Sequence, residues 1–275
     1  MHRNFGVNIF FVFCVFIVCV SFISSNRNLS NNHKEQHSER RHIEVLPKED
    51  TKKQKVSFHA SKTELAKKFL YNWERKNLGV LLNAFDVKNL VELGVQQGKY
   101  SEKILSSCFS CKNYTLVDLW QHQNNYRDLA NVKNSQHDEF YKQTIKRLKK
   151  FENRGVNVKT LKMSTVEASV YIQNNSQDFI YLDARHDYCG VYEDLVLWLP
   201  KLKKSLSIIA GHDFLFANAS ELAGQDWSLC GNGGKNEKAV KGAVLDFFQH
   251  IPNVQGPFVS NEKFPSWLYY ISDLT

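Results

Sequence analysis

Short apolar runs alternate with amphipathic stretches from about residue 60 to the C-terminus. The runs predict strands, and the longer stretches between them, which have helical spacing of apolar residues, predict helices. Strands are expected at residues 90–93, 114–118, 156–161, 178–183, 206–210 and 266–272. Helices are expected at 61–83, after Gly94 through Ser107, and at 135–152, 165–173, 190–203 and 236–250. This alternation predicts an α/β fold, a mostly parallel sheet with helices on both faces.

The first 58 residues have a different pattern. An uncharged apolar stretch covers residues 9–23, after Arg3. Its length, about 15 residues, lies between a signal-peptide core and a membrane-spanning helix. Residues 1–25 are therefore a signal peptide or a type II signal anchor. Both predict the secretory pathway, with the chain either secreted or a single-pass type II membrane protein of the ER or Golgi lumen.

Residues 26–58 are polar and hold few large apolar residues, so we expect a disordered basic stem. The remaining chain, 59–275, is expected to form one domain, and a hydrophobic content of 43% suffices for its core. The formal net charge is +8, of which residues 26–57 carry +3. The domain has no basic run with interleaved aromatic residues, so we expect no nucleic acid partner.

Two further patterns agree with export. Acceptor tripeptides for N-glycans begin at Asn28, Asn113, Asn174 and Asn218. Four cysteines lie outside the apolar segment, and they allow three disulfide pairings. We favour Cys189–Cys230 with Cys108–Cys111, although Cys108-x-x-Cys111 is also the spacing of a redox motif or of half a zinc site.

Candidate ligand-binding residues follow the strands, because parallel sheets bind ligands beyond the carboxyl ends of their strands. The first strand ends in Glu92-Leu-Gly94 with Gly98 four residues later, and a glycine there lets backbone approach a ligand closely. Asp118 ends the second strand, where its two oxygens can accept hydrogen bonds from both ribose hydroxyls of a nucleoside. Met163 and Ser164 end the third strand, where an adenine is expected.

Acidic and imidazole groups gather after the next two strands. One strand runs into Asp183-Ala-Arg-His186-Asp-Tyr and the other into Gly-His212-Asp213-Phe. Burying so many polar groups for packing alone would be costly. These segments are therefore candidates for catalysis.

Together these motifs resemble the class I S-adenosylmethionine-dependent methyltransferases, and within them the O-methyltransferase-like group called methyltransferase family 24. The likeness covers roughly residues 85–275. It implies a Rossmann-like sheet of seven strands with the last strand antiparallel, and S-adenosylmethionine as cofactor. It also implies that Glu92 and Gly94 lie by the methionine part and Asp118 by the ribose, with Asp183 as a further cofactor-binding residue.

The resemblance further implies two catalytic roles. Asp183 and Asp213 occupy the places of acids that hold Mg²⁺ in metal-dependent relatives. His212 is a third candidate ligand, and its imidazole suits softer divalent ions. His186 matches the position of a general base, since a neutral imidazole can accept a hydroxyl proton near pH 7.

We therefore expect O-methylation of a glycan or small-molecule hydroxyl in the secretory pathway. One alternative is an exported, catalytically inactive domain with a binding or structural matrix role, because S-adenosylmethionine is made in the cytosol. Another is a cytosolic enzyme with reduced cysteines. If the apolar segment is uncleaved, the membrane is a further partner.

Overall fold

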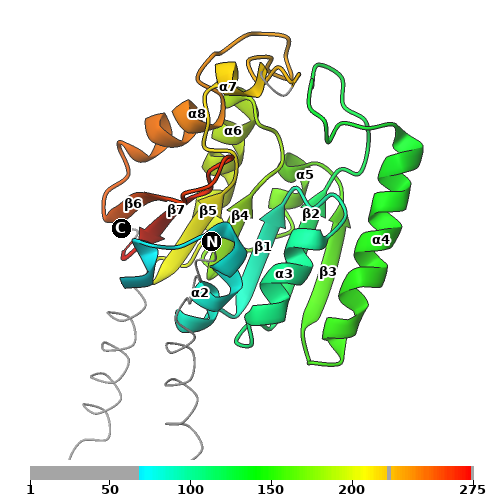
Figure 1. The fold of residues 1–275 in the computed structure, drawn as a ribbon. Coiled ribbons are helices and arrows are strands. Elements are labelled where there is room, and N and C mark those ends of the chain that lie inside the picture. The colour runs from blue at the N-terminus through cyan, green and yellow to red at the C-terminus, as the bar shows by residue number, and fades with distance from the viewer. Residues whose placement is uncertain (1–67, 222–223, 274–275) are drawn as a thin grey trace, which may run out of the picture. The chain divides into compact units, whose positions relative to one another are not determined.

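Seven strands form one sheet in the order β3-β2-β1-β4-β5-β7-β6 (Figure 1). The computed structural model describes residues 68–221 and 224–273. Neighbouring strands from β1 to β5 pair in parallel, whereas β7 runs antiparallel to both β5 and β6. The strands are β1 (Asn89–Leu93), β2 (Asn113–Asp118), β3 (Asn157–Lys162), β4 (Phe179–Leu182), β5 (Ser207–Gly211), β6 (Val254–Val259) and β7 (Trp267–Ile271). The expected α/β fold, with its antiparallel last strand, is confirmed.

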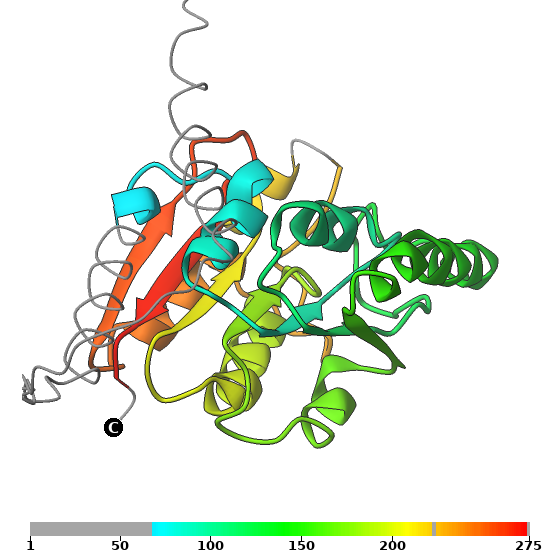
Figure 2. The ribbon, with the colours of Figure 1, turned by 90° about the horizontal axis from the view of Figure 1, so that it is seen from below.

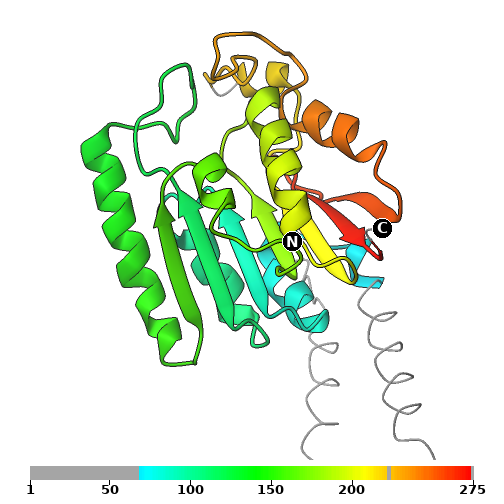
Figure 3. The same cartoon turned by 180° about the vertical axis from the view of Figure 1, so that it is seen from behind.

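Helices cover both faces of this sheet. In chain order the helical elements are η1 (Arg75–Asn77), α2 (Leu78–Ala84), α3 (Lys99–Ser107), α4 (Asn134–Glu152), α5 (Thr165–Ser169), α6 (Tyr188–Trp198), η2 (Leu199–Lys201), α7 (Ala217–Glu221) and α8 (Ala239–Phe248). Helices α2, α3 and α4 pack on one face, and α5, α6 and α8 pack on the other (Figures 1 and 3). Figure 2 shows the sheet between these two layers, with the cyan and green helices on one side and the yellow-green helices on the other. The central strands read as continuous apolar runs because both of their faces are buried.

Two expected elements differ from the structure. The resemblance implies a seventh strand, but the sequence pattern does not locate β6, because β6 holds Gly256 and Pro257 and much of it is exposed, as an edge strand allows. The expected helix at 61–83 is not continuous over its described part, where η1 and α2 follow a turn. Tertiary contacts account for the break. Trp73 Nε1 donates to the Phe258 carbonyl oxygen at 3.0 Å, and the Arg75 amide donates to Glu262 at 3.0 Å.

The expected signal segment (1–25) and stem (26–58) lie outside the described residues. Among the helices of the described part, none is both long and apolar enough to cross a bilayer.

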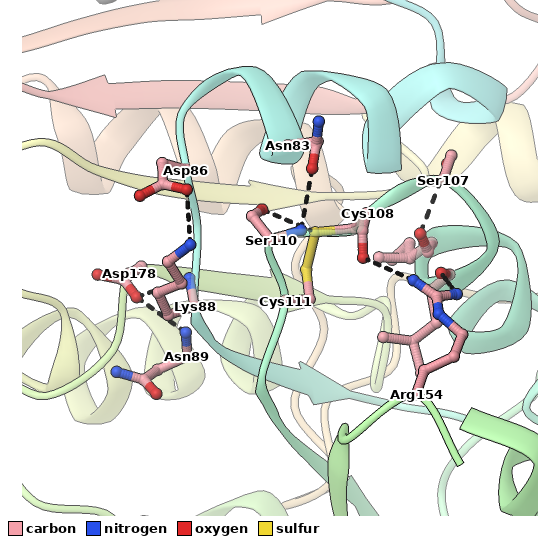
Figure 4. Close-up of a disulfide and its surroundings, with 12 residues drawn as sticks. Asn83, Asp86, Lys88, Asn89, Ser107, Cys108, Ser110, Cys111, Arg154 and Asp178 are labelled. Carbon is pink, nitrogen blue, oxygen red and sulfur yellow. Dashed lines mark hydrogen bonds and ion pairs between the residues drawn. A yellow bond between two sulfur atoms is a disulfide. The ribbon is translucent and has the colours of Figure 1, made fainter. Parts of the chain in front are cut away.

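Two disulfides are present, and they join the pairs favoured from the sequence. Cys108–Cys111 links the end of α3 to the approach of β2, beside the amino-terminal ends of β1 and β4 (Figure 4). Both of its cysteines are buried. Cys189–Cys230 links the start of α6 to the loop after α7. Of the glycan acceptors, Asn113, Asn174 and Asn218 are exposed, and Asn28 lies outside the described residues.

Candidate functional site

A cavity of about 460 Å³ lies at the carboxyl ends of β1, β2 and β4. This is the end of the sheet where the loops after β2 and after α7 lie (Figure 1). Six of the predicted site residues line the cavity, namely Glu92, Gly94, Asp118, Ser164, Asp183 and His186. Gly98, Met163, His212 and Asp213 are not among its lining residues. The strand ends thus converge as expected, and Asp213 lies behind the lining, in contact with His186.

Asp118 holds the turn after β1 as well as lining the cavity. Its Oδ2 accepts hydrogen bonds from the amides of Val95 at 2.8 Å and Gln96 at 2.9 Å. Its Oδ1 accepts a third, from the amide of Trp120 at 2.7 Å. A carboxylate has about four acceptor positions, so roughly one is left for a ligand. The prediction that both oxygens serve a ribose therefore needs correction.

The two glycines of the turn are required by backbone geometry. Gly94 has a φ of +83°, and a Cβ there would lie 1.9 Å from the carbonyl oxygen of Asp183. Gly98 has a φ of +67°, and its Cβ would lie 3.0 Å from the side chain of Thr144. Both φ values favour glycine. These glycines allow close packing within the protein, whereas the sequence interpretation assigned them to ligand approach.

Glu92 is a buried carboxyl in the cavity wall, 1% exposed. Its Oε2 accepts hydrogen bonds from Ser101 Oγ and from the Tyr114 hydroxyl, both at 2.6 Å. Burial raises the pKa of Glu92 to about 7, because desolvation outweighs these two bonds. A cationic ligand group in the cavity would favour its ionised form.

The end of β3 differs from the prediction for an adenine site. The Ser164 hydroxyl caps α5 in a capping box with Glu167, although Ser164 still lines the cavity. Met163 packs against the hydrophobic core, so its thioether is not in the cavity wall. The expected contact between Met163 and an adenine is therefore not supported.

His186 lies among three carboxylates. Its Nδ1 is 2.9 Å from Asp128 Oδ2. Its Nε2 is 3.4 Å from Asp183 Oδ1 and 3.3 Å from Asp213 Oδ2. Burial alone would lower the pKa of His186, but Asp213, Asp128 and Asp183 outweigh it and raise the pKa well above its usual value. The three carboxylates therefore favour the protonated form of the ring.

This environment argues against His186 as the general base. A base must be neutral and needs a free lone pair, whereas both ring nitrogens here face carboxylate oxygens that require N–H donors. Asp183 has the complementary property. Burial would raise its pKa, but His186, Arg75 and His212 lower it below its usual value. In this arrangement His186 joins the ends of β4 and β5, and its role as general base stays a prediction.

Comparisons with known proteins agree with this geometry. A family model described as "Methyltransferase domain" matches residues 91–214, from β1 to just beyond β5. This match agrees with the resemblance to S-adenosylmethionine-dependent methyltransferases that the sequence motifs indicate.

Solved structures are similar to this chain over most of its length. The O-methyltransferase TomG from Streptomyces achromogenes in complex with S-adenosylmethionine is similar at 12% identity and a TM-score of 0.50, over 83% of this chain and 92% of that one. An O-methyltransferase from Bacillus cereus in complex with S-adenosylhomocysteine gives 13% identity and a TM-score of 0.49, over 83% of this chain and 93% of that one. A search of curated proteins gives no match.

The candidate site also contains residues that the sequence analysis missed. Asp128 lies in the loop between β2 and α4, and its Oδ2 accepts from Trp227 Nε1 at 2.8 Å as well as contacting His186. Trp227 belongs to the loop after α7, which Cys189–Cys230 ties to α6. From η1, Arg75 donates to Asp183 Oδ2 at 2.7 Å. These residues belong to no periodic apolar pattern, and none of them directly follows a strand in the sequence. Neither periodicity nor the strand-end rule could therefore identify them.

The possible cation ligands differ from the predicted set. Ligand atoms of Asp183, His186 and Asp213 lie within 4.8 Å of one another, which is close enough to hold one ion. His186 is the third member of this group, and the role of His212 as a ligand stays a prediction. His212 lies beside the group, with Nδ1 3.1 Å from Asp213 Oδ2 and 3.9 Å from Asp183 Oδ1.

Proposed function

We propose that this methyltransferase transfers the methyl group of S-adenosylmethionine to a hydroxyl oxygen of a small molecule. The observation that carries the proposal is the single cavity that joins Glu92, Asp118, Asp183 and His186 at the strand ends. The acceptor would lie toward Asp183 and His186, because Glu92 and Asp118 form the part assigned to the cofactor. Much of the rate would come from aligning the oxygen with the methyl group, since a sulfonium is already activated.

The cavity wall fits the cofactor in charge and size. S-adenosylmethionine carries an ammonium and a sulfonium, and Glu92 offers a buried carboxyl whose Oε1 takes no part in the two bonds to Oε2. The cavity volume of about 460 Å³ is within the usual range for small-molecule sites. In this proposal Glu92 binds the methionine end, and the turn held by Asp118 faces the nucleoside.

A divalent cation fits the three-residue group of Asp183, His186 and Asp213. Two carboxylates and one imidazole suit Mn²⁺, Fe²⁺ or Zn²⁺ better than Mg²⁺. Asp128 supports such a ligand set, because a carboxylate at Nδ1 fixes the imidazole with Nε2 directed to the ion. Once bound, the ion would supply Lewis acidity that makes a nearby hydroxyl more acidic.

In this mechanism the residues of the chain position the groups around the acceptor. Arg75 holds Asp183 from one side, and His186 holds it from the other. The hydrogen bond from Trp227 holds the Asp128 carboxylate that contacts Nδ1 of the imidazole. His186 is a positioning residue here, or a cation ligand when an ion is present.

We also propose that the protein works in the secretory pathway, secreted or held by its N-terminal segment. Two disulfides support an oxidising compartment, since such bonds are rare in the cytosol. Exposed Asn113, Asn174 and Asn218 are compatible with glycosylation. A glycan hydroxyl is the second acceptor class to test beside small molecules.

The test is calorimetric titration of S-adenosylhomocysteine, followed by methyl transfer from radiolabelled S-adenosylmethionine to panels of phenols, sugars and hydroxy acids. Each panel is run with EDTA, Mg²⁺, Mn²⁺ or Zn²⁺. We expect cofactor binding, and turnover with at least one hydroxylated acceptor. Binding without turnover on any panel would favour the inactive binding module, and no binding at millimolar ligand would end the proposal.

A further inference from the structure

His137 is a buried polar side chain with no partner in the protein. It lies near the start of α4, is 7% exposed, and lines the same cavity as Asp118. Neither Nδ1 nor Nε2 has a hydrogen-bond partner, and only two other buried side-chain polar atoms of the described residues share this property. Leaving a buried polar group unpaired costs about 1–3 kcal/mol, so such groups usually have a partner in the functional state.

The surroundings of His137 favour a neutral ring. Burial lowers the pKa of His137, and nearby Asp118 opposes this only in part. A neutral imidazole has one donor and one acceptor nitrogen. Phe140 contacts the ring edge to face, with centroids 6.3 Å apart, but this contact satisfies neither nitrogen.

Asp118 alone has too few free acceptor positions to bind both hydroxyls of a ribose. Three backbone amides occupy its oxygens, so roughly one acceptor position remains, whereas a ribose presents two hydroxyls. The second hydroxyl therefore needs another partner in the same cavity. His137 has two unpaired nitrogens, and its ring is near enough to Asp118 for the carboxylate charge to raise the pKa of His137 against the effect of burial.

We propose that His137 binds a ribose hydroxyl of the cofactor and shares recognition of the sugar with Asp118. This inference rests on the proposed function, because it takes an adenosyl group as the ligand of the cavity. His137 is assigned to cofactor binding, and the methyl transfer itself does not involve it.

The experiment uses the full chain with S-adenosylhomocysteine and its 2′-deoxy and 3′-deoxy analogues as probes. His137→Phe keeps a ring of similar size against Phe140 but has no polar atom. We expect it to weaken S-adenosylhomocysteine binding about tenfold, the usual effect of losing one hydrogen bond of this kind. With the analogue that lacks the contacted hydroxyl, wild type and variant should bind equally.

Two controls keep the outcomes separate. His122→Phe changes an exposed histidine of the adjacent loop and should leave affinity unchanged. His137→Gln retains a donor and an acceptor and should recover most of the binding, which also tests folding at this position. Equal S-adenosylhomocysteine affinity for wild type and a folded His137→Phe would overturn the inference alone, whereas a wild type that binds none of the probes would overturn the proposed function with it.

Discussion

Glu92 gives a quantitative prediction, because its pKa of about 7 places its titration near neutrality. In the free protein about 0.9 of the Glu92 carboxyls are protonated at pH 6, about 0.5 at pH 7 and about 0.1 at pH 8. If the cofactor ammonium binds this carboxyl, it favours the ionised form. Cofactor binding should therefore release nearly one proton at pH 6 and almost none at pH 8.

The assay is calorimetric titration of S-adenosylhomocysteine in buffers of different ionisation enthalpy, which gives the number of protons released. The variant E92Q has no titrating carboxyl, so its release at pH 6 should be lower than that of wild type by about 0.9 protons. E102Q is the matched control, because Glu102 lies outside the cavity wall and its pKa is lowered by its bonds to Lys150 and Arg147. Equal proton release by wild type and E92Q at pH 6 would refute the assignment of Glu92 to the cofactor.

The same carboxyl predicts a pH dependence of stability. The folded pKa of about 7 lies above the ordinary value of 4.5, so the folded state binds more protons between these pH values. The contribution of the neutral carboxyl is complete below pH 4.5 and is lost as the pH rises through 7, at a cost of about 3 kcal/mol. In denaturant unfolding of the free protein, the stability of E92Q relative to wild type should rise by about 3 kcal/mol as the pH increases from 5 to 8. A stability difference between the two proteins that does not change with pH would contradict the account.

Three further predictions follow from the site and its supports. Asp118→Asn places an amide where an oxygen accepts backbone N–H bonds, so we expect the unfolding free energy to fall by about 1–3 kcal/mol and cofactor binding to weaken. An unchanged Tm in thermal unfolding would contradict this. Asp128→Asn removes the charge behind His186, so turnover should fall at least tenfold while calorimetric S-adenosylhomocysteine affinity stays within twofold, and equal turnover would refute the positioning role. Replacing Cys189 and Cys230 by Ser removes a link between residues 41 positions apart and should lower the unfolding free energy by about 4 kcal/mol. The same replacement of Cys108 and Cys111, which are 3 positions apart, should lower it by roughly 2 kcal/mol, and the reverse order would contradict this reasoning.

The sequence predicted the fold well because the buried parallel strands are distinct apolar runs. Strands β1, β2, β4 and β5 all appear within a residue or two of their expected ends. The edge strand β6 has no such signal, because half-exposed positions, glycine and proline obscure its pattern. The break before α2 depends on contacts with residues nearly 190 positions away in the chain, which local periodicity cannot predict.

The site was predicted in position but not in its interactions. The strand-end rule correctly placed Glu92, Asp118 and Asp183 in one cavity. It could not show that backbone amides occupy the oxygens of Asp118. Nor could it show that Asp128 enters from a loop and, together with Asp213, raises the pKa of His186. Those properties arise from tertiary neighbours, which local sequence patterns do not reveal.

The central claim is that one cavity at the strand ends binds the adenosyl cofactor. A crystal structure of the protein with S-adenosylhomocysteine tests it most directly. The account predicts the ligand in this cavity, with its homocysteine ammonium at Glu92 and its ribose between Asp118 and His137. A ligand bound elsewhere, or with its ribose away from Asp118, would contradict it.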